Sequence, residues 1–213
     1  MEKLKIHHMK QGSTEWHEIR KGKLTASHGQ EIATNGVGLK TYVSDIILYS
    51  FIEKEFYTNN DIERGNELEP IAAIAYEMNN FIELHKVGFI QRGEYVGMSP
   101  DGLIMNGDGI EGGIEVKAKN NKNHYKALLD NFIDSKTLWQ IHMSIHISGA
   151  KFWDFCSYNP NFTNSLVQIR VERDEEKCKK IENGLKSGIE LLKLGFSNEK
   201  IKTEIKNKKI CIG

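Results

Sequence analysis

Apolar positions in the first 85 residues recur at intervals of three and four, which is the spacing of one face of an α-helix. Ser13 or Thr14 can cap a short first helix. Further helices are expected within residues 25–51 and directly after Pro70, because the three prolines fit the edges of elements rather than their interiors. The apolar positions that give this period are Val43, Ile46, Ile47 and Phe51 in one segment and Ile71, Ile74, Ala75 and Met78 in the next.

Between residues 87 and 171, short apolar segments of strand character alternate with helical ones. Strands are expected at 87–91, 95–98, 103–105, 114–117, 151–158 and 166–171, and helices at 124–132 and 138–147. A last apolar stripe, at 178–192, predicts an amphipathic helix that ends at Gly195. The order of helices, strands, helices, strands and helix predicts an α/β (α+β) fold, in which a sheet carries helices on its faces.

The length of 213 residues suits one domain with a substantial core. We therefore expect a single domain over 1–213, with the helical N-terminal part at 1–85 integral to it and a basic helical tail at about 197–213. The 29 basic and 29 acidic residues cancel. Net charge therefore gives no sign of general affinity for nucleic acid and does not exclude it, and the local distribution of charge matters more.

Nothing in the sequence points to a membrane or to secretion. No segment approaches the roughly 18 apolar residues that a membrane span needs, and the N-terminus lacks the apolar core of a signal peptide. Cys156, Cys178 and Cys211 are far apart and have no metal-ligand spacing, which is typical of free thiols in a reducing cytoplasm. We expect a cytoplasmic protein without a membrane partner.

Two short segments carry residues suited to phosphodiester chemistry. Ser99-Pro100-Asp101-Gly102 is by itself an ordinary turn sequence, and Glu115-Val116-Lys117 is by itself an ordinary solvated strand face. Together they indicate more, because Glu115 and Lys117 share one face of a strand and Asp101 can converge with Glu115 on a divalent cation. The Val116 carbonyl offers another oxygen ligand, and Lys117 would lie beside the water that the metal activates.

The Asp101…Glu115-x-Lys117 constellation resembles the PD-(D/E)xK nuclease superfamily, and further segments between residues 10 and 173 are similar to its lambda exonuclease, or viral recombinase, family. These segments are Gln11-Gly12-Ser13-Thr14-Glu15-Trp16, Leu24-Thr25-Ala26-Ser27, Arg64-Gly65-Asn66-Glu67-Leu68-Glu69, Gly97-Met98-Ser99-Pro100-Asp101-Gly102, Trp139-Gln140-Ile141-His142-Met143 and Trp153-Asp154-Phe155. Each is weak alone, whereas the combination is specific. The resemblance implies a restriction-endonuclease-like fold with a central mixed sheet flanked by helices.

The resemblance also implies roles for individual residues. Asp101 and Glu115, with the Val116 carbonyl, would bind Mg²⁺, for which Mn²⁺ can substitute, and Lys117 would be the catalytic lysine. Glu69 would support the metal site from its helix, and Gln140 would contact the scissile region or the lysine. The residues that would engage phosphate, including the 5′-phosphate of a strand end, are Arg20, Ser27 and Ser99.

Some of these residues also have plainer interpretations. Arg20 could be a surface cation, and Trp16 and Trp153 are interpreted as core residues, since tryptophan buries most of its area. A basic stretch follows Glu115 and contains no acid, which favours a track for the DNA backbone. Its members are Lys117, Lys119, Lys122 and Lys126, with His124.

The function expected from the resemblance is a magnesium-dependent, 5′-to-3′ exonuclease that acts on double-stranded DNA ends and leaves 3′ overhangs for recombination by annealing. Its relatives suggest a homotrimeric ring, a single-strand annealing protein as partner, and a phage or prophage origin in a bacterial host. Two alternatives stay open: a structure-specific or site-specific endonuclease of the same fold, and a DNA-end-binding protein without catalysis.

Overall fold

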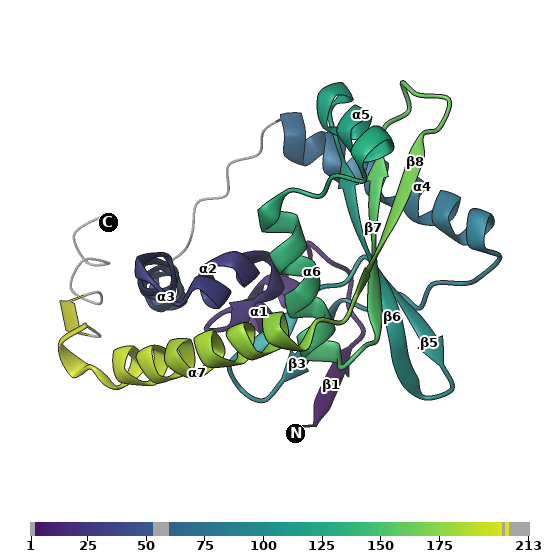
Figure 1. Ribbon diagram of the computed structural model, residues 1–213. Helices are drawn as coiled ribbons and strands as arrows, with labels where there is room; N and C mark the ends of the chain where they lie inside the picture. Colours follow the sequence, from purple (N-terminus) through teal and green to yellow (C-terminus); the bar gives the residue numbers. More distant parts are fainter. Residues whose placement is uncertain (1–2, 53–59, 202, 205–213) are drawn as a thin grey trace.

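The structure is a computed structural model that describes residues 3–52, 60–201 and 203–204. It contains two four-stranded sheets, with helix α6 in contact with strands of both (Figure 1). The elements of the N-terminal half are β1 (Leu4–His7), α1 (Thr14–Arg20), β2 (Leu24–Thr25), a 3-10 turn (Ala26–His28), α2 (Gly29–Thr34), α3 (Val37–Phe51), α4 (Asn60–Asn80), β3 (Phe89–Arg92), β4 (Val96–Met98) and β5 (Gly102–Asn106). Those that follow are β6 (Gly109–Ala118), α5 (Asn121–Asp130), α6 (Ser135–Ser148), β7 (Phe152–Tyr158), β8 (Leu166–Glu172) and α7 (Glu175–Ser197).

The sheet with the longer strands has the order β5-β6-β7-β8. It is mixed, because β6 and β7 are parallel and the other neighbours are antiparallel. Parallel neighbours need a long crossover connection, which α5 and α6 supply. Side chains alternate along β6 and β7, so that Phe155 faces α6 whereas Val116 and Cys156 face α4. The expected α/β fold with a central mixed sheet flanked by helices is confirmed.

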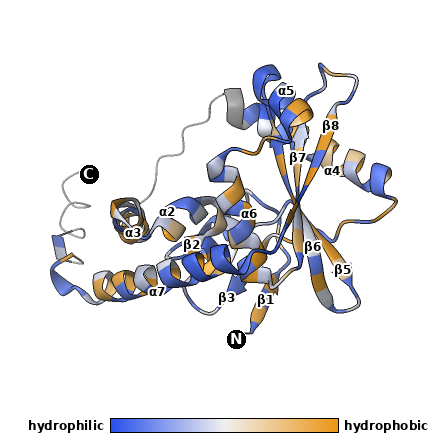
Figure 2. Cartoon of the chain, in the orientation of Figure 1, coloured by the Kyte–Doolittle hydropathy of each residue, from blue (hydrophilic) through white to orange (hydrophobic). Residues whose placement is uncertain are grey.

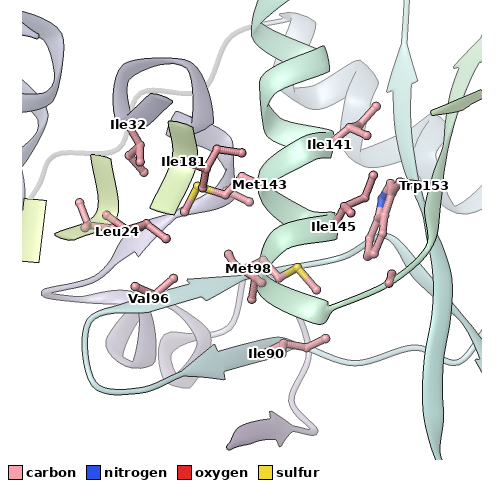
Figure 3. Close-up of a cluster of buried hydrophobic side chains, with 14 of the residues drawn as sticks. Leu24, Ile32, Ile90, Val96, Met98, Ile141, Met143, Ile145, Trp153 and Ile181 are labelled. Atoms are coloured by element: carbon pink, nitrogen blue, oxygen red, sulfur yellow. The ribbon is translucent and has the colours of Figure 1, made fainter. Parts of the chain in front are cut away.

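The sheet with the shorter strands has the order β1-β3-β4-β2. Its strand β4 packs against α6, which also contacts β6 and β7 of the first sheet. Figure 3 shows the core between the two sheets, where Ile141 and Ile145 of α6 lie beside Trp153 of β7 and near Met98 of β4. Trp153 is fully buried, as predicted. Gly113 makes room for it, since a Cβ at that position would lie 2.4 Å from the indole ring.

The apolar face predicted for α4 is wrong. Pro70 lies inside this helix, and the predicted stripe points to solvent, with Ile71, Ile74 and Met78 exposed by 49%, 52% and 71%. The buried face consists of small residues that let the helix approach the sheet, together with Tyr76, whose hydroxyl donates to Asp154 at 2.6 Å. The members of this buried face are Ala72, Ala73 and Tyr76.

Two further expectations need correction. The N-terminal part is not all helical, because β1 pairs with β3 and β2 pairs with β4. Gly195 does not end the last helix: α7 continues to Ser197, and a Cβ at Gly195 would lie 2.1 Å from the side chain of Ile47 in α3. This glycine is therefore a point of close helix contact.

The tail predicted at about 197–213 falls largely outside the described residues, as does Cys211, while Cys156 and Cys178 are free and buried. Within the described part of the chain, no helix is both long enough and apolar enough to cross a membrane.

Candidate active site

The candidate site lies where β6 extends beyond its neighbour β5. The first residue of β5, Gly102, pairs with Ile114, so that Val116 has no partner strand on that side. The preceding residue, Asp101, takes the place of the missing strand, and its Oδ2 accepts the Val116 N–H at 2.6 Å. Because the N–H and C=O of one strand residue point to the same side, the Val116 carbonyl faces the same edge as Asp101.

Glu115 and Lys117 lie together on the face of β6 toward α6. Lys117 Nζ is 2.5 Å from Glu115 Oε1, and Gln140 of α6 donates to the same oxygen through Nε2 at 2.6 Å. The Glu115 side chain is almost fully buried, whereas that of Lys117 is about one third exposed. Gln140 thus contacts Glu115 and not Lys117, which corrects the expected contact with the lysine.

The cluster contains more negative than positive charge. Burial raises the pKa of Asp101 well above its ordinary value, and Glu115 raises it further while Lys117 opposes the rise. Burial also raises the pKa of Glu69 on α4, which interacts with Lys117 and Glu115. Burial alone would lower the pKa of Lys117, but Glu115, Asp101 and Glu69 outweigh it and the pKa is raised. The ammonium group of Lys117 is therefore the counter-charge that the carboxyl groups of Glu115, Asp101 and Glu69 share.

This donor set fits a hard divalent cation. Among the described residues, no donor binds Asp101 Oδ1 or Glu115 Oε2, and the Val116 carbonyl lies on the same edge. The described residues contain no group of three His, Cys, Asp or Glu side chains spaced as a metal site. Magnesium does not require one, since it is commonly held by one or two carboxylates and keeps several waters. A cation here would also offset the negative charge of Glu115 and Glu69, which adds to burial in raising the pKa of Asp101.

Arg20, at the end of α1, is connected to this cluster by a hydrogen bond to Ser99, which precedes Asp101 by two residues. Its Nη1 donates to Ser99 Oγ at 2.9 Å, and its guanidinium lies over the Trp16 ring at 4.1 Å from the centroid. Among the described residues, no carboxylate forms an ion pair with Arg20. Burial lowers its pKa, opposed by Tyr42. Such an arginine is a cation that lacks a protein counter-charge, and an incoming anion can supply it.

A cavity of about 700 Å³ opens beside Arg20, with walls from α1, the β2 region and α3. Thr25, His28 and Tyr42 line it. Ser27 is not among the lining residues but hydrogen-bonds with both Thr25 and His28, at 3.2 and 3.3 Å. Of the predicted phosphate-binding residues, Arg20 lines this cavity and directly contacts Ser99, whereas Ser27 reaches the cavity only through Thr25 and His28.

The predicted basic track is only partly present. Lys119 Nζ is 2.8 Å from Asp134, which also caps α6. His124 is fully buried and bonds Ser157 and the Asn164 carbonyl, so its inclusion in a DNA track was wrong. Spacing along the sequence had grouped this histidine with the lysines, whereas its ring faces β7 and β8.

Sequence reasoning missed two supporting residues. Trp16 was interpreted as core, but it is only half-buried, and its Nε1 donates to Ser99 Oγ at 2.8 Å and to the Gly88 carbonyl at 3.1 Å. Gln11 Nε2 donates to the Pro100 carbonyl at 2.8 Å. Both side chains fix the turn that carries Ser99 and Asp101. The signal was their place in the Gln11-to-Trp16 segment, to which no role had been given.

The mixed sheet, with an Asp–Glu–Lys cluster at its end, has the architecture of restriction-endonuclease-like nucleases. The fold and the cluster together place the chain in this class of proteins. The chain belongs to the YqaJ-like viral recombinase domain family, whose model matches residues 15–151. No match was found among curated proteins.

Among solved structures, the chain is similar to an alkaline exonuclease from Laribacter hongkongensis. The two are 25% identical with a TM-score of 0.77, over 94% of this chain and 100% of that one. The same values hold for that enzyme in complex with dAMP. A phage-related exonuclease from Haemophilus somnus 129PT is 14% identical with a TM-score of 0.59, over 82% of this chain and 95% of that one, and this likeness shows the fold alone.

Proposed function

We propose that this protein is a magnesium-dependent exonuclease that digests one strand of double-stranded DNA from its 5′ end and leaves a 3′ single-stranded overhang for recombination by annealing. The observation that carries the proposal is the Asp101–Glu115–Lys117 cluster, with Arg20 held on Ser99 at its edge. Membership of a viral recombinase family and likeness to an alkaline exonuclease support it. The likeness to a complex with dAMP, a mononucleotide, supports exonucleolytic cleavage.

The residues divide the work of hydrolysis. Asp101, Glu115 and the Val116 carbonyl would hold one or two magnesium ions, which supply a water of lowered pKa and charge stabilisation at the phosphate. Lys117, fixed by Glu115, would orient that water and stabilise charge on the scissile phosphate. Gln140 holds Glu115 in place, and Glu69 adds to the charge that favours a cation.

End recognition is assigned to the cavity beside Arg20. A guanidinium can bind a terminal phosphate through two parallel hydrogen bonds, and Ser99 holds it two residues from Asp101. Ser27 would act indirectly, through its hydrogen bonds with Thr25 and His28 of the cavity wall. Lys119, which pairs with Asp134, would contribute to the path of the DNA backbone. A 5′-phosphate bound there would place the first phosphodiester near the cluster.

The proposal extends to assembly. We infer a single nuclease domain over 1–213 that forms a homotrimeric ring around DNA, with a single-strand annealing protein as partner in the cytoplasm of a bacterial host. A ring explains how a chain with 29 basic and 29 acidic residues stays on DNA through many cycles, because topology replaces net electrostatic affinity. Light scattering at micromolar concentration tests it, and a monomeric mass would remove the ring while leaving the chemistry intact.

Digestion of linear duplex and of covalently closed circles in Mg²⁺ tests the activity. The proposal expects only the linear DNA to be degraded, whereas an endonuclease would cut both and a binding protein neither. A label at one 5′ or one 3′ end then gives the direction. Lys117→Ala should retain DNA binding and lose about two orders of magnitude in rate. Full activity in excess chelator, or in Asp101→Ala, would refute the site assignment.

A further inference from the structure

Helix α5 presents an outward face that its own fold does not use. His124 and Ala127 are buried and anchor the helix, with His124 bonded to Ser157 at 2.9 Å. The opposite face, which we call the α5 outer face, consists of Lys122, Tyr125, Lys126 and Leu129, at helical spacings of three and four. Tyr125 is 54% exposed and Leu129 is 59% exposed. Figure 2 shows hydrophilic and hydrophobic segments side by side on this helix.

Phe132 continues this face beyond the helix. It is 44% exposed, and Lys126 Nζ lies 5.3 Å from its ring centroid. Two aromatic rings thus alternate with two ammonium groups, and Asp130 is the sole acidic residue within α5. Exposed rings interleaved with cations suit a chain that offers both flat apolar faces and phosphates.

A polar pocket of about 490 Å³ adjoins this face. Its described lining includes two cations and no carboxylate; these residues are Arg64, Asn120, Asn121, Lys122, Pro160 and Asn161. Arg64 donates to the carbonyl of Lys119 at 2.9 Å, which places the pocket at the end of β6, two residues beyond Lys117. Lys122 belongs to both the pocket and the α5 outer face, so the two form one continuous cationic surface.

We propose that the α5 outer face and this pocket bind single-stranded DNA, and that the strand is the undigested 3′ strand as it leaves the active site. The proposal rests on the proposed exonuclease function and adds a second DNA-binding surface to it. Bases stack on exposed aromatic rings only when they are unpaired. The phosphates of a duplex would therefore contact the lysines, whereas its bases would not stack on Tyr125 or Phe132. The strand under digestion is consumed at the cluster, and only its complement supplies unpaired DNA that reaches α5.

The charge distribution favours DNA over a protein partner. A surface that docks an apolar helix is depleted of charge at its centre, whereas here Lys126 lies between the exposed apolar side chains and Lys122 lies next to Tyr125, one helical turn away. The exposed stripe on α4 has the opposite character, since Ile71, Ile74 and Met78 follow one another at helical spacing without a cation in their midst.

Fluorescence anisotropy with the full chain carrying Lys117→Ala separates binding from hydrolysis. The parent should bind a 3′-tailed duplex more tightly than a blunt one. Tyr125→Ala with Phe132→Ala should weaken binding of the tailed duplex by about tenfold or more and leave the blunt duplex unchanged. Phe81→Ala, which removes another exposed ring, is the matched control and should change neither. Tyr125→Phe should retain binding, because the ring remains.

Lysine substitutions give an independent measure. Lys122→Ala with Lys126→Ala should reduce the slope of log affinity against log salt by roughly 0.7 per lysine on single strands. The exposed pair Lys179→Ala with Lys180→Ala on α7 is the control and should leave the slope unchanged.

Three outcomes would overturn the proposal or its parts. Unchanged binding of tailed DNA by the double aromatic variant would make the α5 outer face a protein-docking surface. A preference for 5′-tailed over 3′-tailed duplex that depends on Tyr125 would assign the face to the digested strand. If the chain with intact Lys117 fails to digest linear duplex but the tail dependence persists, the proposed exonuclease function fails and the binding surface stands.

Discussion

Replacing Arg20 by alanine should remove the preference for a 5′-phosphorylated end. The side chain is held in place by Ser99 at 2.9 Å and by the Trp16 ring, and no described carboxylate neutralises it. A hydrogen bond to a charged partner contributes about 1.5–3 kcal/mol, which corresponds to a factor of roughly 10 to 150. Arg20→Ala should therefore reduce kcat/KM on phosphorylated duplex by that factor and leave 5′-hydroxyl duplex nearly unchanged.

Initial rates on duplexes that differ only in the 5′ group measure this effect. Arg20→Lys should recover part of the preference, because an ammonium keeps the charge but not the paired geometry of the guanidinium. Lys40→Ala, at an exposed cation on α3, is the control and should behave as wild type. Melting curves establish that Arg20→Ala is folded, since it also loses the contact with Trp16.

The reasoning would be refuted by a wild-type protein that digests both ends at the same rate. It would equally be refuted if Arg20→Ala kept the full preference while remaining folded. Either result would make Arg20 a structural residue that stiffens the Ser99 turn, and the terminal phosphate would then be recognised elsewhere.

Substitutions of three other polar side chains give further tests. Asp154→Ala should destabilise the fold by about 1–3 kcal/mol, because it leaves the hydroxyl of buried Tyr76 without its acceptor and removes the two 2.8 Å hydrogen bonds from Arg170; an unchanged melting temperature would contradict this. Gln140→Ala should raise the Mg²⁺ concentration for half-maximal activity about tenfold or more by freeing Glu115, and a wild-type titration would contradict it. Burial, with Lys177, lowers the pKa of His142 to about 4, so stability present above the ordinary pKa of 6.5 should fall by about 3 kcal/mol as the pH approaches 4. Denaturant unfolding across this range should show a shallower fall in His142→Leu, and an equal slope would contradict the assignment.

The central part of the site could be predicted from the sequence because it depends on local geometry. Glu115 and Lys117 share one face of β6 because alternate residues of a strand point the same way. Asp101 directly precedes β5, which pairs with β6, so the sequence already places the three residues on neighbouring strands. The bond from the Val116 amide to Asp101 could not be read in advance, since it depends on β5 being shorter than β6 at that end.

Tertiary partners decided the features that the sequence left ambiguous. On α4, two sets of residues have the same period, and the set with Ala72 and Tyr76 faces the sheet because Tyr76 reaches Asp154. His124 stands among lysines in the sequence, yet its ring bonds Ser157, which lies 33 residues away. Trp16 has the size of a core residue, but its N–H donates to Ser99, on a turn that local pattern does not bring near it.

The short bond between the Val116 amide and Asp101 provides a spectroscopic reporter inside the active site. A backbone N–H that donates to a carboxylate at 2.6 Å is strongly deshielded, so its proton resonance should lie downfield of those in the ordinary strand ladder. Any change in the charge or orientation of the Asp101 carboxylate reaches this proton directly. A protein labelled with ¹⁵N only at valine would thus allow cation and DNA binding to be followed through one resonance, without a label on the nucleic acid.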